Sequence, residues 1–454
     1  MSARLRQVVA DLRLLAVIGA PLIGNNLASI GVNVGDTLMA SRLGAEQLAG
    51  VAIGSGIWVA LFLLGLGIIM ALGPTVAQHF GAGRDLDIGH DTRQGLWLAC
   101  LVSVLVIVVM RSMAPVLARL GIERAIAVLA QDYLDALSFG VFGAYGYHVL
   151  KQMNEGVGRA LPIMTVVTIS LPINVLLNYS FLFGRFGAPA LGAPGCGLGS
   201  GISFWLMFLM LAGYTARSPH YRRFGLWRAL ERPDGAAVAR LVGLGLPIGL
   251  SLFLQSGLFT GVALLMAKLG TNAVAAHQIT LNYCGLVFMV PLGFAMALTV
   301  RVGQAIGARE VQAARRMGLI GVILCGSLAS VAATATLNFA PAIVGVYTRD
   351  PAVAAVALTL FRVAALLQFA DGVQVAASFA LRGLKDTRVP LLINATSYWG
   401  IGFSLAIICG RPDAAGAAGI WGGLAIALGV AAVLLSVRFL VVSGRLLAST
   451  RTAS

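Results

Sequence analysis

The sequence predicts an all-α polytopic membrane protein with twelve transmembrane helices arranged as two related halves. Three observations support this fold class. The 454-residue chain is 59% hydrophobic and 11% charged, its apolar runs are long enough to cross a bilayer, and it repeats itself at an offset of 226 residues. The long aliphatic runs favour helices, because the strands of a membrane barrel would alternate polar and apolar residues.

The repeat runs in the same direction in both halves. Pro21 corresponds to Pro247, and the window 70–82 corresponds to 296–308 without a gap and with a shared Met and a shared Gln. Two such repeats in a membrane chain are typical of transporters whose lobes surround a central cavity that opens alternately to each side. We therefore expect an N-terminal lobe at 1–220, a linker at 221–236 and a C-terminal lobe at 237–454.

The apolar runs predict the spans, and basic residues predict their orientation. An even number of spans places both termini on one side of the membrane. That side contains 23 Arg and Lys residues and the other contains eight, so we expect cytoplasmic termini. The expected spans are 13–40, 46–78, 94–113, 124–150, 161–184, 195–216, 238–267, 272–304, 315–340, 352–380, 388–409 and 416–442.

Composition and motifs exclude several function classes. The net charge of +15 comes from membrane-flanking loops, so we expect no nucleic-acid partner. The linker residues Arg222, Arg223 and Arg228 are expected to lie against anionic lipid. The sequence has no GxxxxGK[ST] loop, no HxxxH pair and no cysteine pair with metal-ligand spacing. We therefore expect a monomer that is not an enzyme, needs no cofactor and is driven by an ion gradient.

Two acidic residues lie well inside apolar helices, Asp36 in the first expected span and Asp371 in the tenth. A carboxylate inside a bilayer is costly and usually has a function. It can exchange protons, or it can hold Na⁺ or an organic cation when ionised. The alternative interpretation is a structural acid whose oxygens are satisfied by neighbouring hydroxyls and amides.

The fifth expected span offers partners for Asp36. Asn174 and Asn178 are four residues apart and share a helix face, and Pro172 just before them loosens the backbone ladder. Ser200, at the start of the next span, adds a hydroxyl. These groups can form an ion site, with Na⁺ possible at Asp36, Asn174 and Asn178, or they can join helices as interhelical hydrogen bonds.

Several stretches together resemble one transporter family. The chain is similar to multidrug and toxic compound extrusion (MATE) transporters of the NorM branch. The resemblance implies two six-helix lobes facing each other in a V-shaped cleft in the bacterial inner membrane. It also implies export of cationic, amphipathic compounds in exchange for H⁺ or Na⁺. The matching stretches are GAPLI (19–23), VGDTLMASRLG (34–44), LAGVAIGSGIW (48–58), MALGPTVAQHFGAG (70–83), LPINVLLNYSFLFGRFGAP (171–189), AAHQI (275–279) and LRGLKDTRVP (381–390).

The resemblance also assigns roles to individual residues. The family's ion-coupling positions correspond here to Asp36, Asn174, Asn178, Ser200 and Asp371. The chain departs from the family in its C-terminal half.

The family's helix 7 glutamate is replaced there by Gln255, and position 367 is Leu where an aromatic hydroxyl is common. A neutral amide adds no charge to a Na⁺ cage, so proton coupling through Asp36 is favoured. Gln255 and Gln278 are then expected to contact substrate together with Asp36 and Asp371.

Two further expectations follow. Protonation of Asp36 is expected to bend the first helix near its hinge, Pro21, and so to drive alternating access. A lipid-linked oligosaccharide flippase of the same superfamily is the alternative function. It would need basic residues for a pyrophosphate head, and Arg362 is the only one that the sequence places clearly inside a span.

Overall fold

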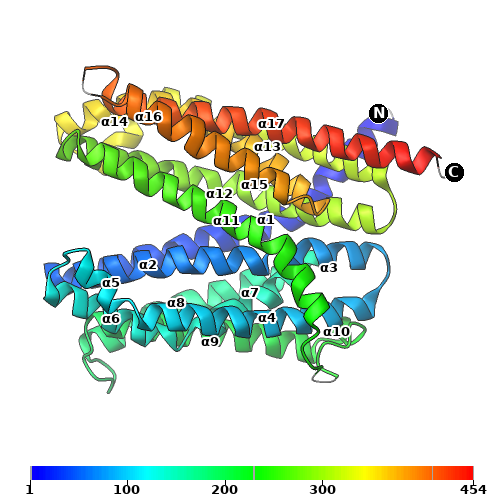
Figure 1. The fold of residues 1–454 in the computed structure, drawn as a ribbon, viewed down its shortest axis with the longest axis horizontal. Helices are drawn as coiled ribbons and strands as arrows, with labels where there is room; N and C mark the ends of the chain where they lie inside the picture. Colours follow the sequence, from blue (N-terminus) through cyan, green and yellow to red (C-terminus); the bar gives the residue numbers. More distant parts are fainter. Residues whose placement is uncertain (1–2, 229–230, 412, 453–454) are drawn as a thin grey trace. The chain divides into compact units, whose positions relative to one another are not determined.

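The structure is a computed structural model that describes residues 3–228, 231–411 and 413–452 (Figure 1). Within this part of the chain the elements are helices joined by turns and short loops, without a β-strand. The side chains of 3–5, 32–38, 40–41 and 450–452 lie outside the described part, and that of Asp36 is among them.

The chain forms two compact units. One comprises Gly24–Gly249, and the other comprises Met1–Ile23 together with Leu250–Ser454. The boundaries therefore fall inside two helices, α1 (Ala3–Ala40) and α11 (Gly235–Ala267). These two boundaries are 226 residues apart, so they occupy equivalent positions of the repeat. The lobes expected at 1–220 and 237–454 are the two halves of the sequence repeat. The contacts between residues instead divide the chain inside α1 and α11, the first helix of each half.

The unit Gly24–Gly249, here the N-unit, contains the end of α1, the start of α11 and the helices between them. Figure 1 shows its long helices running side by side. Their bounds are η1 (Ser41–Leu43), α2 (Ala45–Ile69), α3 (Leu72–Gly81), α4 (Asp85–Arg111), α5 (Ala114–Arg119), α6 (Arg124–Ser138), α7 (Val141–Gly156), α8 (Leu161–Phe183), α9 (Ala193–Arg217) and α10 (Pro219–Arg222).

The other unit, here the C-unit, combines the start of α1 with the end of α11 and all later helices. Helix α14 is its centre, because it packs against α12, α13 and α17. The bounds are α12 (Thr271–Gly307), α13 (Val311–Tyr347), α14 (Pro351–Gly383), α15 (Arg388–Ala395), η2 (Thr396–Phe403), α16 (Ser404–Cys409) and α17 (Gly416–Thr452). Element η2 is a π-helix, a geometry that is rare and often found at functional positions.

Glycines allow close packing of two segments, the start of α11 in the N-unit and the start of α1 in the C-unit, which we call the crossing segments. In the N-unit, a Cβ at Gly67 of α2 would clash with the backbone of Gly249 in α11. In the C-unit, a Cβ at Gly293 of α12 would lie 2.5 Å from the Ile23 side chain of α1. Residues 67 and 293 are repeat equivalents, as are 23 and 249. A glycine at the equivalent position thus admits both segments, against glycine backbone in the N-unit and against an isoleucine in the C-unit.

The described helices confirm a protein of up to twelve spans. Eleven are long and apolar enough to cross a membrane, and α6 with α7, bent by 51° at a short break, makes a twelfth if the pair is one span. Gly140 lies at this bend, where a Cβ would clash with the backbone of Gly201 in α9. The fourth expected span, 124–150, is this bent pair.

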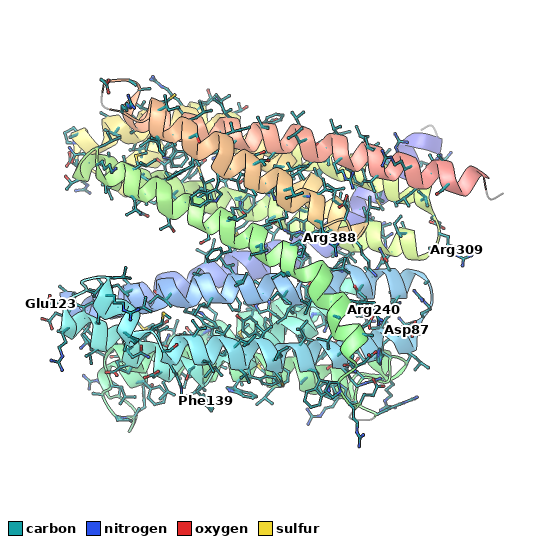
Figure 2. All side chains as sticks on the ribbon, viewed as in Figure 1. Asp87, Glu123, Phe139, Arg240, Arg309 and Arg388 are labelled. Carbon is teal, nitrogen blue, oxygen red and sulfur yellow. The ribbon has the colours of Figure 1, made fainter. Side chains whose placement is uncertain are left out.

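Several helices extend beyond the apolar runs that predicted them. Helix α4 begins at Asp85 rather than at 94, and Asp85 and Asp87 lie in its first turn, where carboxylates favour the positive end of the helix dipole. Figure 2 shows Asp87 and Glu123 at opposite ends of the N-unit. Hydropathy locates the apolar centre of each span, whereas the helix continues into its polar flanks.

Candidate functional site

A cluster of amide and hydroxyl side chains joins helices α8 and α9 in the N-unit. The Asn174 amide donates to the Ser203 hydroxyl at 3.2 Å, and the Asn178 amide donates to the Asn174 oxygen at 3.3 Å. The Ser200 hydroxyl lies 3.5 Å from the Asn178 amide. All four side chains are buried. The structure thus brings together Asn174, Asn178 and Ser200, which the sequence singled out, and we call the four residues the amide cluster.

The local sequence explains how this cluster forms. Asn174 and Asn178 are one turn apart and therefore lie on one face of α8. The start of α9 is rich in glycine, and a Cβ at Gly199 would clash with the Asn178 side chain. Close approach of the two helices brings the serine hydroxyls within reach of the amides. Sequence reasoning missed Ser203, although it lies three residues after Ser200 and so shares its helix face.

Asp36 and Pro21 both lie in α1, on opposite sides of the unit boundary. Asp36 belongs to the N-unit with the amide cluster, but its side chain lies outside the described residues. Its pairing with that cluster, and a Na⁺ site there, remain predictions. Pro21 lies inside the helix and two residues before the boundary at Ile23. The hinge at Pro21 also remains a prediction.

The C-unit places Asp371 inside α14 without a hydrogen-bond partner for its buried Oδ1 atom among the described residues. Gln255 of α11 is partly buried, and Gln278 of α12 is exposed. Within the described part of the chain no hydrogen bond connects these three side chains. Asp371 is therefore a carboxylate in a transmembrane helix with unused hydrogen-bonding capacity, and a shared substrate site with the two glutamines stays a prediction.

Sequence reasoning missed a chain of polar contacts beside Asp371. The Tyr283 hydroxyl lies 2.8 Å from the Thr336 hydroxyl, which donates to the Gln368 oxygen at 3.0 Å. The Gln368 amide in turn lies 3.7 Å from the Cys284 sulfur. Gln368 lies one turn before Asp371 on α14. Residues of α12, α13 and α14 meet here, and no local pattern in the sequence links them.

Arg362 was expected to be the only basic residue clearly inside a span, but among the described residues the helices also contain two buried basic side chains. Arg362 is exposed, whereas Lys151 of α7 and Arg382 of α14 are 7% and 8% exposed. Arg382 stacks on the Phe379 ring at 4.1 Å. The expectation failed because both residues were assigned to loops, and α14 continues to Gly383 beyond its expected end at 380.

Lys151 forms a buried ion pair with Glu155, one turn later on α7. The Lys151 ammonium lies 3.8 Å from a Glu155 oxygen, and the Gln152 amide donates to the other oxygen at 3.2 Å. Glu155 is only 4% exposed. The two charges compensate each other within the helix, so neither is available as a free charge.

The linker is attached to α4 through a second charged cluster. The Arg93 guanidinium donates to Glu231 and to the Gly225 carbonyl, and His90 Nδ1 lies 2.7 Å from the other Glu231 oxygen. The hydrogen bond from Arg93, followed by that from His90, lowers the pKa of the Glu231 carboxyl below its usual range. The Trp97 indole donates to the Glu231 carbonyl at 2.9 Å. The segment predicted as a linker therefore packs into the N-unit.

This attachment predicts a pH-dependent contribution to stability. Because the Glu231 pKa is lowered in the folded protein, its carboxylate stabilises the fold above the ordinary pKa range of glutamate. That contribution is lost as the pH falls through the lowered pKa. Glu231→Gln is therefore expected to lower the melting temperature at about pH 7 and to have less effect below about pH 4. The effect is roughly 1 kcal/mol or less, because the pair is partly exposed to solvent.

The control for this prediction is Glu123→Gln, which removes an exposed carboxyl at the other end of the N-unit (Figure 2). It is expected to leave the melting temperature unchanged at both pH values. Equal shifts for the two variants at about pH 7 would contradict a specific role for Glu231.

The spans, the repeat and the buried polar groups define a multi-pass helical membrane transporter. The chain belongs to the MATE transporter family, because the family profile described as MatE matches residues 21–180 and 247–408. The two matched stretches begin at the equivalent prolines, Pro21 and Pro247. MATE proteins are transporters and not enzymes, which confirms that part of the sequence interpretation.

Individual relatives cover nearly the whole chain. It is 38% identical over 439 residues to the multidrug resistance protein MdtK of Yersinia enterocolitica, and equally to MdtK of Yersinia pseudotuberculosis, with 96% of each chain covered. A crystal structure of MATE in complex with MaL6 matches with a TM-score of 0.86 and 20% identity over 96% of this chain and 97% of that one. The bent form of the Vibrio cholerae MATE transporter VcmN matches with a TM-score of 0.84 and 18% identity, covering 97% and 99%. These structures confirm the MATE fold.

Proposed function

We propose that this protein is a secondary multidrug efflux antiporter that exports cationic, amphipathic compounds in exchange for protons. Export proceeds by alternating access across the bacterial inner membrane, with both termini in the cytoplasm. The 38% identity to MdtK over 96% of both chains supports multidrug efflux rather than the flippase alternative. The protein works as a monomer, with the exposed linker residues Arg222 and Arg228 against anionic lipid.

One structural observation carries the proposal of cation exchange. The Asp371 carboxylate lies in a transmembrane helix, and one of its oxygens is buried without a hydrogen-bond partner among the described residues. Such a group exchanges a proton for an organic cation without first breaking an ion pair. A neutral amide at Gln255 provides no second formal charge for Na⁺, which favours protons as the coupling ion.

Coupling in the N-unit is assigned to Asp36 together with the amide cluster. Protonation removes the Asp36 charge, so its interaction with the exported cation weakens and α1 repacks. The amide cluster contributes hydrogen-bonding groups that do not titrate. Substrate is held by Asp36 and Asp371 as counter-charges and by Gln255 and Gln278 as polar contacts.

Transport in proteoliposomes tests the two acids. Under an imposed pH gradient, Asp36→Asn is expected to reduce export of a cationic dye at least tenfold, because the neutral amide cannot release a proton. Asp371→Asn is expected to weaken dye binding and to reduce export as well. Asn178→Asp serves as a comparison that adds a titratable group to the amide cluster.

The coupling ion is tested by imposing pH and Na⁺ gradients separately on the wild-type protein. Export is expected with the pH gradient alone and not with the Na⁺ gradient alone. Undiminished pH-driven export by Asp36→Asn would exclude its coupling role, and export driven by Na⁺ alone would exclude proton coupling.

A further inference from the structure

Helix α14 has a polar face that runs from Asp371 toward the end of the helix. Asp371, Gln374, Ser378 and Arg382 follow one another at intervals of three, four and four residues, so they lie on one side of the helix. Gln374, Ser378 and Arg382 are each at least nine-tenths buried. A rise of 1.5 Å per residue separates Asp371 from Arg382 by about 16 Å along the axis.

The segment formed by α15 and the π-helix η2 meets this polar face at Gln374. The Gln374 amide donates to the Asn394 oxygen of α15 at 3.5 Å, and the Tyr398 side chain of η2 is 1% exposed. The Tyr398 hydroxyl is buried without a hydrogen-bond partner among the described residues. Ser397, adjacent in η2, is completely buried.

Four groups at this site are buried without a hydrogen-bond partner among the described residues: Asp371 Oδ1, Arg382 Nη1, Ser397 Oγ and Tyr398 Oη. A buried polar atom left in this state costs about 1–3 kcal/mol, so native proteins normally satisfy it. Ordered water is the usual partner where several polar groups converge. One carboxylate, one guanidinium and two hydroxyls offer both the acceptors and the donors that water requires.

We propose that the C-unit contains a buried water site lined by Asp371, Gln374, Ser378, Arg382, Ser397 and Tyr398. We call it the α14 water site. Its ligand is a short file of ordered water molecules, which satisfies the four unpartnered atoms. The site lies inside one unit, along α14, and is distinct from the proposed contacts of substrate with Gln255 and Gln278.

The α14 water site gives Asp371 a route for its proton, and this consequence rests on the proposed proton coupling. The proton leaves the carboxyl oxygen and passes along hydrogen-bonded water toward the Arg382 end of α14. The basic residues around that end predict a cytoplasmic location. The fixed positive charge of Arg382 opposes the passage of Na⁺ or an organic cation through the same file, because like charges repel strongly where water is scarce. Gln374 and Tyr398 position the water and are not themselves transported groups.

Hydroxyl-radical footprinting with a millisecond X-ray pulse detects such water directly, because radiolysis of bound water labels side chains that bulk solvent does not reach. Tyr398 is expected to be labelled at least ten times faster than Tyr145, which is equally buried but whose hydroxyl faces the Leu61 carbonyl at 3.3 Å. Labelling of Tyr398 no faster than that of Tyr145 would overturn the water site. The comparison uses two residues of the same wild-type protein, so it does not depend on a variant that folds.

Gln374→Leu then tests the route. It is expected to reduce labelling of Tyr398 several-fold, to leave Tyr145 unchanged, and to slow pH-driven export several-fold with dye affinity within about twofold of wild type. Export at the wild-type rate with reduced labelling would overturn the proton route. If export proves to be driven by Na⁺ while Tyr398 is rapidly labelled, the proposed coupling fails and the water site stands.

Discussion

Lys151→Met is expected to destabilise the N-unit by about 3–5 kcal/mol, because it leaves the Glu155 carboxylate buried without its ion-pair partner. Glu155 is 4% exposed, and the Gln152 amide alone does not compensate its charge. Methionine matches the length of the lysine stem, so the change removes the charge while retaining most of the packing. The measurement is the melting temperature of the protein in detergent, with unfolding monitored by intrinsic fluorescence.

The double variant Lys151→Met with Glu155→Gln is the control for charge. It removes both charges, and it is expected to recover most of the lost stability because no uncompensated ion remains. If the double variant melts as low as Lys151→Met, the loss arises from packing and the buried pair does not have the assigned role.

Gly67→Ala is expected to have the second large effect, a loss of about 1–3 kcal/mol. The added methyl group would clash with the backbone of Gly249, and backbone cannot move aside as a flexible side chain can. Helices α2 and α11 must therefore separate, which reduces the close packing that holds membrane helices together.

Gly56→Ala is the matched control, because Gly56 lies in the same helix and a Cβ there has open space around it. It is expected to be neutral or slightly stabilising, since alanine is the better helix former. By the repeat, Gly293→Ala is expected to weaken the corresponding contact with Ile23 in the C-unit. Equal melting temperatures for the Gly67 and Gly56 variants would contradict the proposed contact.

Much of the fold was predictable because it depends on hydropathy and on the repeat. The apolar runs predicted each span, including the span that bends at Gly140, and family motifs identified the fold class. The positions of the helix ends were less accessible. Asp85 and Arg382 lie in polar flanks that hydropathy assigns to loops, although the helices continue through them.

The candidate site was predictable only where its residues are neighbours along one helix. Asn174 and Asn178 share a face of α8, so their hydrogen bond follows from their spacing. The contact of Thr336 with Gln368 joins separate helices, and no periodic pattern encodes it. The sequence also did not predict that the start of α1 packs in the C-unit and the start of α11 in the N-unit. This arrangement depends on contacts between residues that are far apart in sequence.

The two crossing segments have different histories during synthesis, although their packing is equivalent. When residues 235–249 leave the ribosome, their partner α2 has already been made. Residues 3–23 emerge first, yet their partner around Phe294 follows more than 250 residues later. Contacts between residues so distant in sequence form late. The start of α1 must therefore remain without its final neighbours until most of the chain exists, which makes the assembly order asymmetric in a symmetric architecture.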